Sequence, residues 1–314
     1  MDRVLSRRNS FSDQSHKVFT RGTFDYLENE RGQNLFCKYW HLDDPTIEPK
    51  ALVFISHGFS EHLGLYEHVG RTLAQNNILA FGHDHVGHGR SEGIRAYVES
   101  VDEYVNDLMD HCKIAKREYG NVPLFLLGHS MGGMVVLRAG LLYPGFFRGI
   151  VFQGPLIIPG PQLGPIDFRL SWWKTIPVGV VLRLMDWVDP EMILGGVAMN
   201  LITRDEDMKK MLKDDGLRWE GGCKVRLLRA FVNCLYDNLA QLRNLTTPFL
   251  TLHGDHDSLC NVLGSRLMIQ ESRSGDKSII EFPGAVHNLY IEIREVREIA
   301  LKRTCEWILQ RSLK

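Results

Sequence analysis

The chain has 314 residues, of which 44% are hydrophobic and 24% are charged, an ordinary composition for a globular protein with a core of normal size. Its 37 Lys and Arg residues balance 38 Asp and Glu residues, so no excess charge is present to attract nucleic acid, and we expect no nucleic-acid partner. No run approaches the length of apolar sequence that a transmembrane helix needs.

Residues 1–20 are basic and rich in Ser, with few aliphatic side chains, and this composition predicts a disordered tail. They lack the apolar run of a signal peptide. The six cysteines are widely spread and contain no C-x-x-C pair, which favours free thiols in a reducing compartment over disulfides. We therefore expect a cytoplasmic protein.

The next residues alternate between short apolar runs and segments with helical spacing. Residues 23–41 give two alternating runs around a polar turn, which predicts a hairpin. Six apolar runs without strict alternation predict strands buried on both faces, at 51–56, 78–81, 124–127, 149–152, 249–252 and 278–282. Helical spacing occurs at 66–75, 101–119, 131–142 and about 295–310. Together they predict an α/β fold with a mostly parallel central sheet and helices on both faces.

The alternation stops between residues 155 and 245, a stretch rich in Pro, Gly, Trp and Met. We interpret residues 155–245 as an inserted cap over the strand ends, where open α/β sheets bind their ligands. Residues 21–154 and 246–314 then form the core.

Residues 178–188 of the cap predict a helix that is apolar on nearly every side. Such a helix is either buried against the core or exposes apolar surface, in which case it serves as a lid that contacts membrane lipid. On the second interpretation the protein associates peripherally with membranes, and an acyl chain contacts Trp172, Trp173, Leu182 and Met185.

Residues 128–132 read G-H-S-M-G, a G-x-S-x-G pattern placed directly after a predicted strand and before a predicted helix. Roughly one chain in ten of this length contains the pattern by chance, so the pattern alone is moderate evidence. Its position between a predicted strand and a predicted helix makes it much stronger evidence. A serine on such a sharp turn is pushed outward, and the glycines allow the turn. We predict that Ser130 is a nucleophile; the alternative is a serine that only caps a helix.

A serine hydroxyl needs an adjacent base, and in this arrangement an acid and then a histidine follow along the chain, each after a strand. His287 follows the strand at 278–282 and is the predicted base. Asp255 and Asp257 both follow the strand at 249–252, and their position leaves the choice of acid open. His129 adjoins the serine, but its side chain should point away from Ser130 at the turn.

Acyl transfer also needs two N–H donors for the developing oxyanion. The backbone N–H of Met131 is the first candidate, and the N–H of Phe59, after the strand at 51–56, is the second. The sequence HDHVGHG at 83–89 contains possible metal ligands but lacks a second close cluster, so we expect neither a metal nor an organic cofactor.

Five phrases together resemble monoacylglycerol lipases, which are serine hydrolases of the α/β-hydrolase fold. They are SHGFSEH (56–62), HDHVGHGRSEG (83–93), FLLGHSMGG (125–133), HGDHDSLC (253–260) and GAVH (284–287). The resemblance extends from about residue 23 to 309.

This resemblance implies a carboxylic ester hydrolase, an acylglycerol lipase that converts monoacylglycerols to fatty acid and glycerol through an acyl-enzyme. It places the nucleophile on Ser130, the acid on Asp257 rather than Asp255, and the base on His287. It also supports Phe59 and Met131 as oxyanion donors. A further match places Cys260 near the substrate.

The same triad would serve a lysophospholipase, another carboxylesterase or thioesterase, or an acyltransferase that uses an alcohol in place of water. A lipid-binding protein that has lost its chemistry would show a gap in the triad or the serine turn, and the sequence shows none. The oligomeric state is not predicted.

Overall fold

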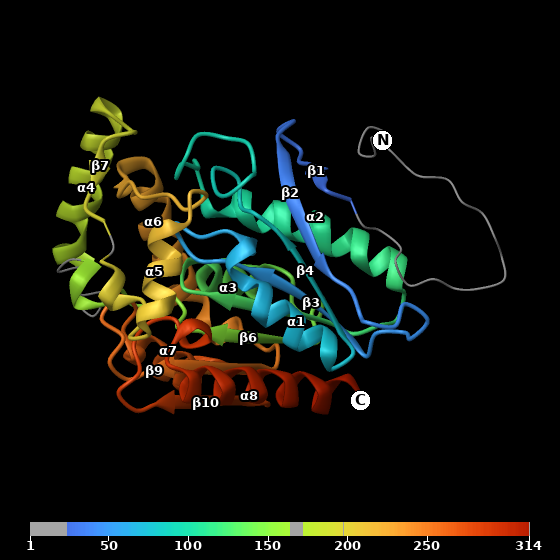
Figure 1. Ribbon diagram of the computed structural model, residues 1–314. Coiled ribbons are helices and arrows are strands. Elements are labelled where there is room, and N and C mark those ends of the chain that lie inside the picture. Colours follow the sequence, from blue (N-terminus) through green and yellow to red (C-terminus); the bar gives the residue numbers. More distant parts are fainter. Residues whose placement is uncertain (1–23, 164–171, 197, 314) are drawn as a thin grey trace.

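Eight strands form one sheet in the computed structural model, in the order β1-β2-β4-β3-β5-β6-β9-β10 (Figure 1). The structure describes residues 24–163, 172–196 and 198–313, except the side chains of 163 and 172–178. The strands are β1 (Tyr26–Glu28), β2 (Asn34–Trp40), β3 (Ala51–Ser56), β4 (Ile78–His83), β5 (Leu124–His129), β6 (Gly149–Gln153), β9 (Phe249–Gly254) and β10 (Lys277–Phe282).

The hairpin β1–β2 pairs antiparallel, as does β2 with β4, and every later pair in this sheet is parallel. The predicted mostly parallel sheet is therefore confirmed. All residues of β3, β4, β5, β6 and β9 are buried, which explains why their sequences are continuous apolar runs.

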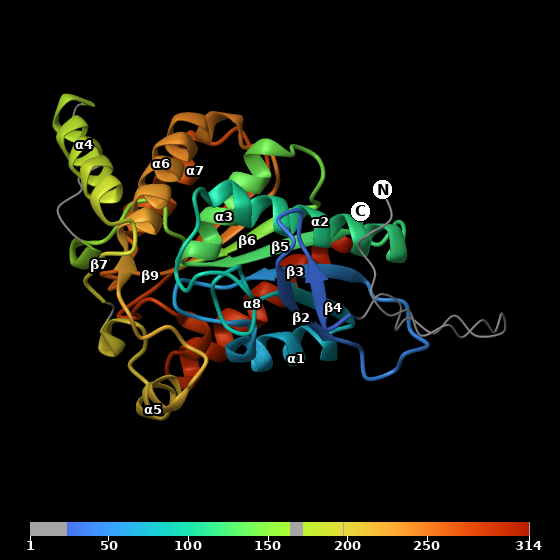
Figure 2. The same cartoon turned by 90° about the horizontal axis from the view of Figure 1, so that it is seen from above.

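Helices cover both faces of the sheet (Figure 2). α1 (Glu67–Gln75) and α8 (Arg294–Ser312) contact each other and share one apolar core. α2 (Val101–Tyr119), α3 (Met131–Leu142) and the Met268 side chain of α7 (Val262–Glu271) belong to the other core. Short 3₁₀ helices connect these elements at Leu63–Tyr66, Pro161–Leu163, Met199–Leu201, Leu242–Asn244 and Leu289–Ile291.

Among the described residues, three α-helices and a two-stranded sheet lie between β6 and β9 in the chain. They are α4 (Trp172–Val188), β7 (Ile193–Leu194), α5 (Glu206–Asp214), β8 (Cys223–Lys224) and α6 (Val225–Gln241), with β7 and β8 antiparallel. α6 packs on α3, and α4 packs on α6 at the outer edge of the molecule (Figure 1).

The division into core and cap remains a prediction, which this arrangement supports. The predicted tail, residues 1–20, lies outside the described residues. Within the described part of the chain, no helix is long and apolar enough to cross a membrane.

The histidines of the HDHVGHG sequence belong to a buried imidazole cluster. His83, His85 and His88 lie there with His57 and His111, and all five are almost fully buried. Nδ1 of His83 is 3.2 Å from Nδ1 of His111. Nε2 of His57 accepts the backbone N–H of His85 at 2.9 Å. Burial lowers the pKa of all five imidazoles, that of His88 to about 4 and that of His111 to about 3, so they are neutral at pH 7.

The free energy of unfolding is expected to fall as the pH drops from about 6.5 toward 4. The unfolded chain binds protons at the ordinary histidine pKa, whereas the folded cluster resists protonation until the pH is much lower. Above pH 6.5 both states are neutral, and the contribution of the cluster is complete. Within the window each histidine contributes a slope of about 1.4 kcal/mol per pH unit, measured by urea unfolding at several pH values.

A variant pair tests this origin of the pH dependence. His111→Gln should reduce the slope by one histidine's share, whereas Lys210→Gln, which alters an exposed side chain of α5 outside the cluster, should not. His129 acts in the opposite direction, because Glu61 raises its pKa against the lowering effect of burial. Equal slopes in wild type and His111→Gln would contradict the explanation.

Candidate active site

Ser130 occupies a strained turn between β5 and α3. Its φ of 54° lies in the left-handed region, which non-glycine residues rarely adopt. The turn is held because Ser130 N–H donates to the Gln153 carbonyl at 3.1 Å and the Ser130 carbonyl accepts Leu156 N–H at 2.9 Å. A Cβ on Gly132 would lie 2.0 Å from the Ser56 carbonyl oxygen, so only glycine lets the first turn of α3 approach the end of β3.

His287 and Asp257 form a buried hydrogen-bonded pair. Nδ1 of His287 is 2.7 Å from Oδ2 of Asp257. Oδ1 of Asp257 accepts the backbone N–H groups of Leu259 and Cys260, each at 2.9 Å. Burial raises the pKa of Asp257, but the imidazoles of His287 and His253 and the hydrogen bonds outweigh it and hold that pKa well below its usual range. The carboxylate is therefore ionised at neutral pH.

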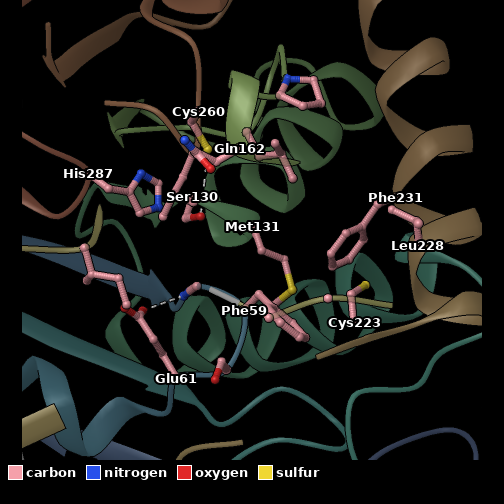
Figure 3. Close-up of a pocket in the computed structure, with 18 of the residues that line it drawn as sticks. Phe59, Glu61, Ser130, Met131, Gln162, Cys223, Leu228, Phe231, Cys260 and His287 are labelled. Carbon is pink, nitrogen blue, oxygen red and sulfur yellow. Dashed lines mark hydrogen bonds between the residues drawn. The ribbon is translucent and has the colours of Figure 1, made fainter. Parts of the chain in front are cut away.

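Ser130, His287 and Cys260 surround one end of a cavity, with Phe231 and Leu228 across from them (Figure 3). In this rotamer Oγ of Ser130 lies 4.0 Å from Sγ of Cys260. Within the described residues, Ser130 forms no hydrogen bond to His287. Such catalytic hydrogen bonds are often loose in ligand-free enzymes.

The structure separates the two candidate acids. Oδ1 of Asp255 is 2.7 Å from Nδ1 of His256 and accepts Gly284 N–H at 2.6 Å, and the residue is exposed. Asp257 alone of the two contacts His287. His129 is engaged by other groups, because its Nδ1 lies 3.1 Å from the Gln153 carbonyl oxygen and its Nε2 lies 3.5 Å from Oε1 of Glu61.

The backbone N–H groups of Phe59 and Met131 are free to bind an oxyanion. Both residues line the cavity, and neither N–H donates a hydrogen bond to a described residue. Oε2 of Glu61 accepts Gly58 N–H at 2.9 Å and Tyr66 O–H at 2.6 Å, which fixes the loop that carries Phe59.

Glu61 is also part of a buried ion pair with His129, whose Nε2 is 3.5 Å from its Oε1. Burial raises the pKa of Glu61, but His129 and the hydrogen bonds hold it well below its usual range. The sequence did not indicate a role for Glu61, although Glu61 lies in the SHGFSEH phrase. It also did not indicate a role for His253, the first residue of HGDHDSLC. Nε2 of His253 is 3.2 Å from Oδ2 of Asp257.

Cys260, which the sequence resemblance places near the substrate, lies beside Ser130 in the structure. It is buried, lines the cavity and donates its backbone N–H to Asp257. Burial raises the pKa of its thiol well above the usual value, so the thiol is neutral beside Ser130.

The cavity has a volume of about 260 Å³, and α6 contributes part of its apolar lining through Leu228, Phe231, Val232 and Leu235. The Phe59 ring packs edge-on against Phe231, with centroids 6.3 Å apart. Cys223, which sequence reasoning did not select, also lines the cavity.

Of the four α4 residues predicted to contact substrate, only Leu182 and Met185 have side chains among the described residues. Leu182 is buried and Met185 is half-buried, and neither lines the cavity among the described residues. α6 supplies the wall on this side, and α4 packs on α6. The side chains of Trp172 and Trp173 lie outside the described residues.

Comparison with known proteins decides the family. The Hydrolase_4 family model, described as serine aminopeptidase S33, matches residues 47–294. Monoglyceride lipase of Mus musculus is 35% identical over 286 residues, which cover 91% of this chain and 90% of that protein. The chain belongs to the monoglyceride lipase family of serine hydrolases.

Other members of the monoglyceride lipase family agree with this assignment. Monoglyceride lipase of Homo sapiens is 35% identical over 287 residues, which cover 91% of this chain and 90% of that protein. The solved structure of a soluble variant of monoglyceride lipase from Saccharomyces cerevisiae, in complex with a substrate analog, has a TM-score of 0.78 at 22% identity, with 96% of this chain and 99% of that chain covered. The predicted α/β-hydrolase fold and the resemblance drawn from the motifs are confirmed.

Proposed function

We propose that the protein hydrolyses monoacylglycerols to fatty acid and glycerol through an acyl-enzyme on Ser130. The observation that carries this proposal is the buried His287–Asp257 pair beside a strained serine, at one end of a cavity with an apolar wall. Membership in the monoglyceride lipase family supports the substrate class. The protein is a carboxylic ester hydrolase that needs no cofactor for this chemistry.

In the proposed mechanism, Oγ of Ser130 attacks the ester carbonyl while His287 takes the hydroxyl proton. Asp257 keeps the imidazole in the required tautomer and stabilises the imidazolium. The tetrahedral oxyanion accepts the N–H groups of Phe59 and Met131. When the ester C–O bond breaks, His287 returns the proton to the leaving glycerol oxygen. Water then attacks the acyl-enzyme by the same steps and releases the fatty acid.

A labelling experiment and a substrate panel test this function. The purified protein should react with a fluorophosphonate probe and release fatty acid fastest from a monoacylglycerol. The panel compares lysophosphatidylcholine, triacylglycerol and an acyl-CoA of the same chain length, with an added alcohol acceptor to detect acyl transfer. If the protein is labelled but another ester is hydrolysed fastest, the serine mechanism is retained and monoacylglycerol is rejected as the preferred substrate. If folded protein is not labelled, both the serine mechanism and the proposed substrate are rejected.

We further propose that α4 contacts a membrane surface. Trp187 is 84% exposed, and it is one of five exposed apolar side chains of α4, which are Val180, Val181, Leu184, Trp187 and Val188. An exposed apolar patch of this kind is typical of an interaction site, and tryptophan suits the headgroup level of a bilayer. A lipid substrate that resides in the bilayer would then lie close to the protein.

The double variant Leu184→Asp/Trp187→Asp is expected to lose binding to phosphatidylcholine vesicles. The kcat/KM for monoacylglycerol in those vesicles should fall about tenfold or more, because the apolar contact is replaced by charge. Hydrolysis of a short, water-soluble ester should be unchanged. Ile299→Asp is the matched control, since Ile299 is 50% exposed on α8. Equal vesicle binding by wild type and the double variant would reject α4 as the contact.

A further inference from the structure

Arg218 is a buried cation in the wall of the active-site cavity. It is 9% exposed and follows α5 in the cap. The backbone N–H of the next residue, Trp219, donates to the Ser60 carbonyl at 3.3 Å. Arg218 is therefore positioned beside the loop that carries Phe59, one of the two proposed oxyanion donors.

Half of the Arg218 guanidinium has no partner. Nη1 donates to the Leu212 carbonyl at 2.9 Å and contacts Sδ of Met199 at 3.6 Å. Nε is buried without a hydrogen-bond partner. Nη2 forms no hydrogen bond to a described residue, and no described carboxylate forms an ion pair with this side chain. The Nε–Nη2 edge is the edge that binds a carboxylate or phosphate with two parallel hydrogen bonds.

The carboxylates of Glu61 and Asp215 are already engaged. Glu61 lines the same cavity, but its two oxygens bind Gly58, Tyr66, Asn288 and His129. Asp215 caps the backbone around Arg218, and its other oxygen is 2.9 Å from Nε2 of His62. A buried guanidinium without an anion is costly, which points to an anion brought by the ligand.

The cavity lining combines apolar and charged side chains. The α6 side chains Leu228, Phe231, Val232 and Leu235 form an apolar wall suited to an acyl chain. Glu61 and Arg218 contribute the charged part of the lining. With the ester carbonyl at Ser130 and the acyl chain against α6, Arg218 and Glu61 are the charged groups of the lining that remain to contact the alcohol part of the substrate.

From this arrangement we infer that Arg218 is a specificity-determining residue that binds a phosphate or carboxylate on the alcohol part of the ester. The inference rests on the proposed ester hydrolysis and extends the substrates to monoacylglycerols that carry an anionic group, such as a 1-acylglycerol 3-phosphate. The reaction is unchanged: the ester C–O bond breaks, the acyl group is transferred to Ser130 and then to water, and the anionic alcohol leaves with the proton from His287.

The test measures a selectivity ratio. For one acyl chain, kcat/KM is measured with the neutral monoacylglycerol, the 1-acylglycerol 3-phosphate and the acyl ester of glyceric acid, and active sites are counted with a fluorophosphonate. In Arg218→Gln the ratio of kcat/KM for an anionic substrate to kcat/KM for the neutral monoacylglycerol should fall on the order of 10- to 100-fold. The substrate that loses more, phosphate or carboxylate, identifies the preferred anion. Lys213→Gln, which removes an exposed cation from nearby α5, should keep the wild-type ratio.

A second measurement uses wild type alone and does not depend on the folding of a variant. Glycerol 3-phosphate should inhibit monoacylglycerol hydrolysis competitively and at lower concentration than glycerol. An unchanged kcat/KM ratio in Arg218→Gln, or equal inhibition by glycerol 3-phosphate and glycerol, would overturn the role of Arg218. Neither result would contradict the proposed hydrolysis of monoacylglycerols. Absence of hydrolysis of every ester would instead reject the proposed function itself.

Discussion

Ser130→Ala is expected to lower kcat for monoacylglycerol hydrolysis by roughly 10⁶-fold and to abolish fluorophosphonate labelling. The acyl-enzyme cannot form without Oγ, and the neighbouring thiol is a poor substitute because burial keeps Cys260 protonated. The variant should fold normally, since the backbone hydrogen bonds of residue 130 to Gln153 and Leu156 do not involve its side chain. Fatty-acid release, probe labelling and urea unfolding measure the three expectations.

Ser312→Ala is a suitable control for this experiment. Ser312 lies in the last turn of α8, and its hydroxyl donates to the Ile308 carbonyl, away from the cavity. It should retain both activity and labelling. A Ser130→Ala protein that still reacts with the probe would place the nucleophile elsewhere and reject the catalytic assignment.

The strands could be predicted because strands buried on both faces of a parallel sheet have continuous apolar sequences. Most helices could be predicted from the helical spacing of their apolar residues. The run at 124–127 lacks polar residues because both faces of β5 are covered, and the predicted bounds of α2 and α3 agree with the structure. The site followed from the same topology, since Ser130, Asp257 and His287 each follow a strand of one sheet.

The supporting residues could not be predicted because their contacts join distant parts of the chain. Glu61 binds Asn288, which is 227 positions away, and no local pattern indicates that contact. Arg218 lies in an irregular segment after α5, where polarity alone suggests an exposed residue. The apolar sequence of α4 likewise does not say which of its sides faces the molecule, and the structure places α6 against the cavity instead.

Position in the chain left Asp255 as a competitor of Asp257 for the role of the acid, and a pair of variants separates them. Asp257→Asn is expected to lower kcat by about 10⁴-fold, because an amide at this position favours the wrong tautomer of His287 and does not stabilise the imidazolium. Asp255→Asn should change kcat less than about twofold, because Asp255 binds only His256 and Gly284 at the surface. Steady-state hydrolysis of one monoacylglycerol by both variants measures the difference.

The comparison also separates catalysis from folding. Oδ1 of Asp257 accepts two backbone N–H groups, which the carbonyl of an asparagine can still accept, so urea unfolding should show a much smaller effect than kcat. Ser130 should still react with a fluorophosphonate in Asp257→Asn, but more slowly, because the base is present and only its tautomer and charge are affected. A large loss of kcat in Asp255→Asn, together with an active Asp257→Asn, would assign the role of the acid to Asp255. His287 would then have to leave the 2.7 Å contact with Asp257 that orients it in this structure.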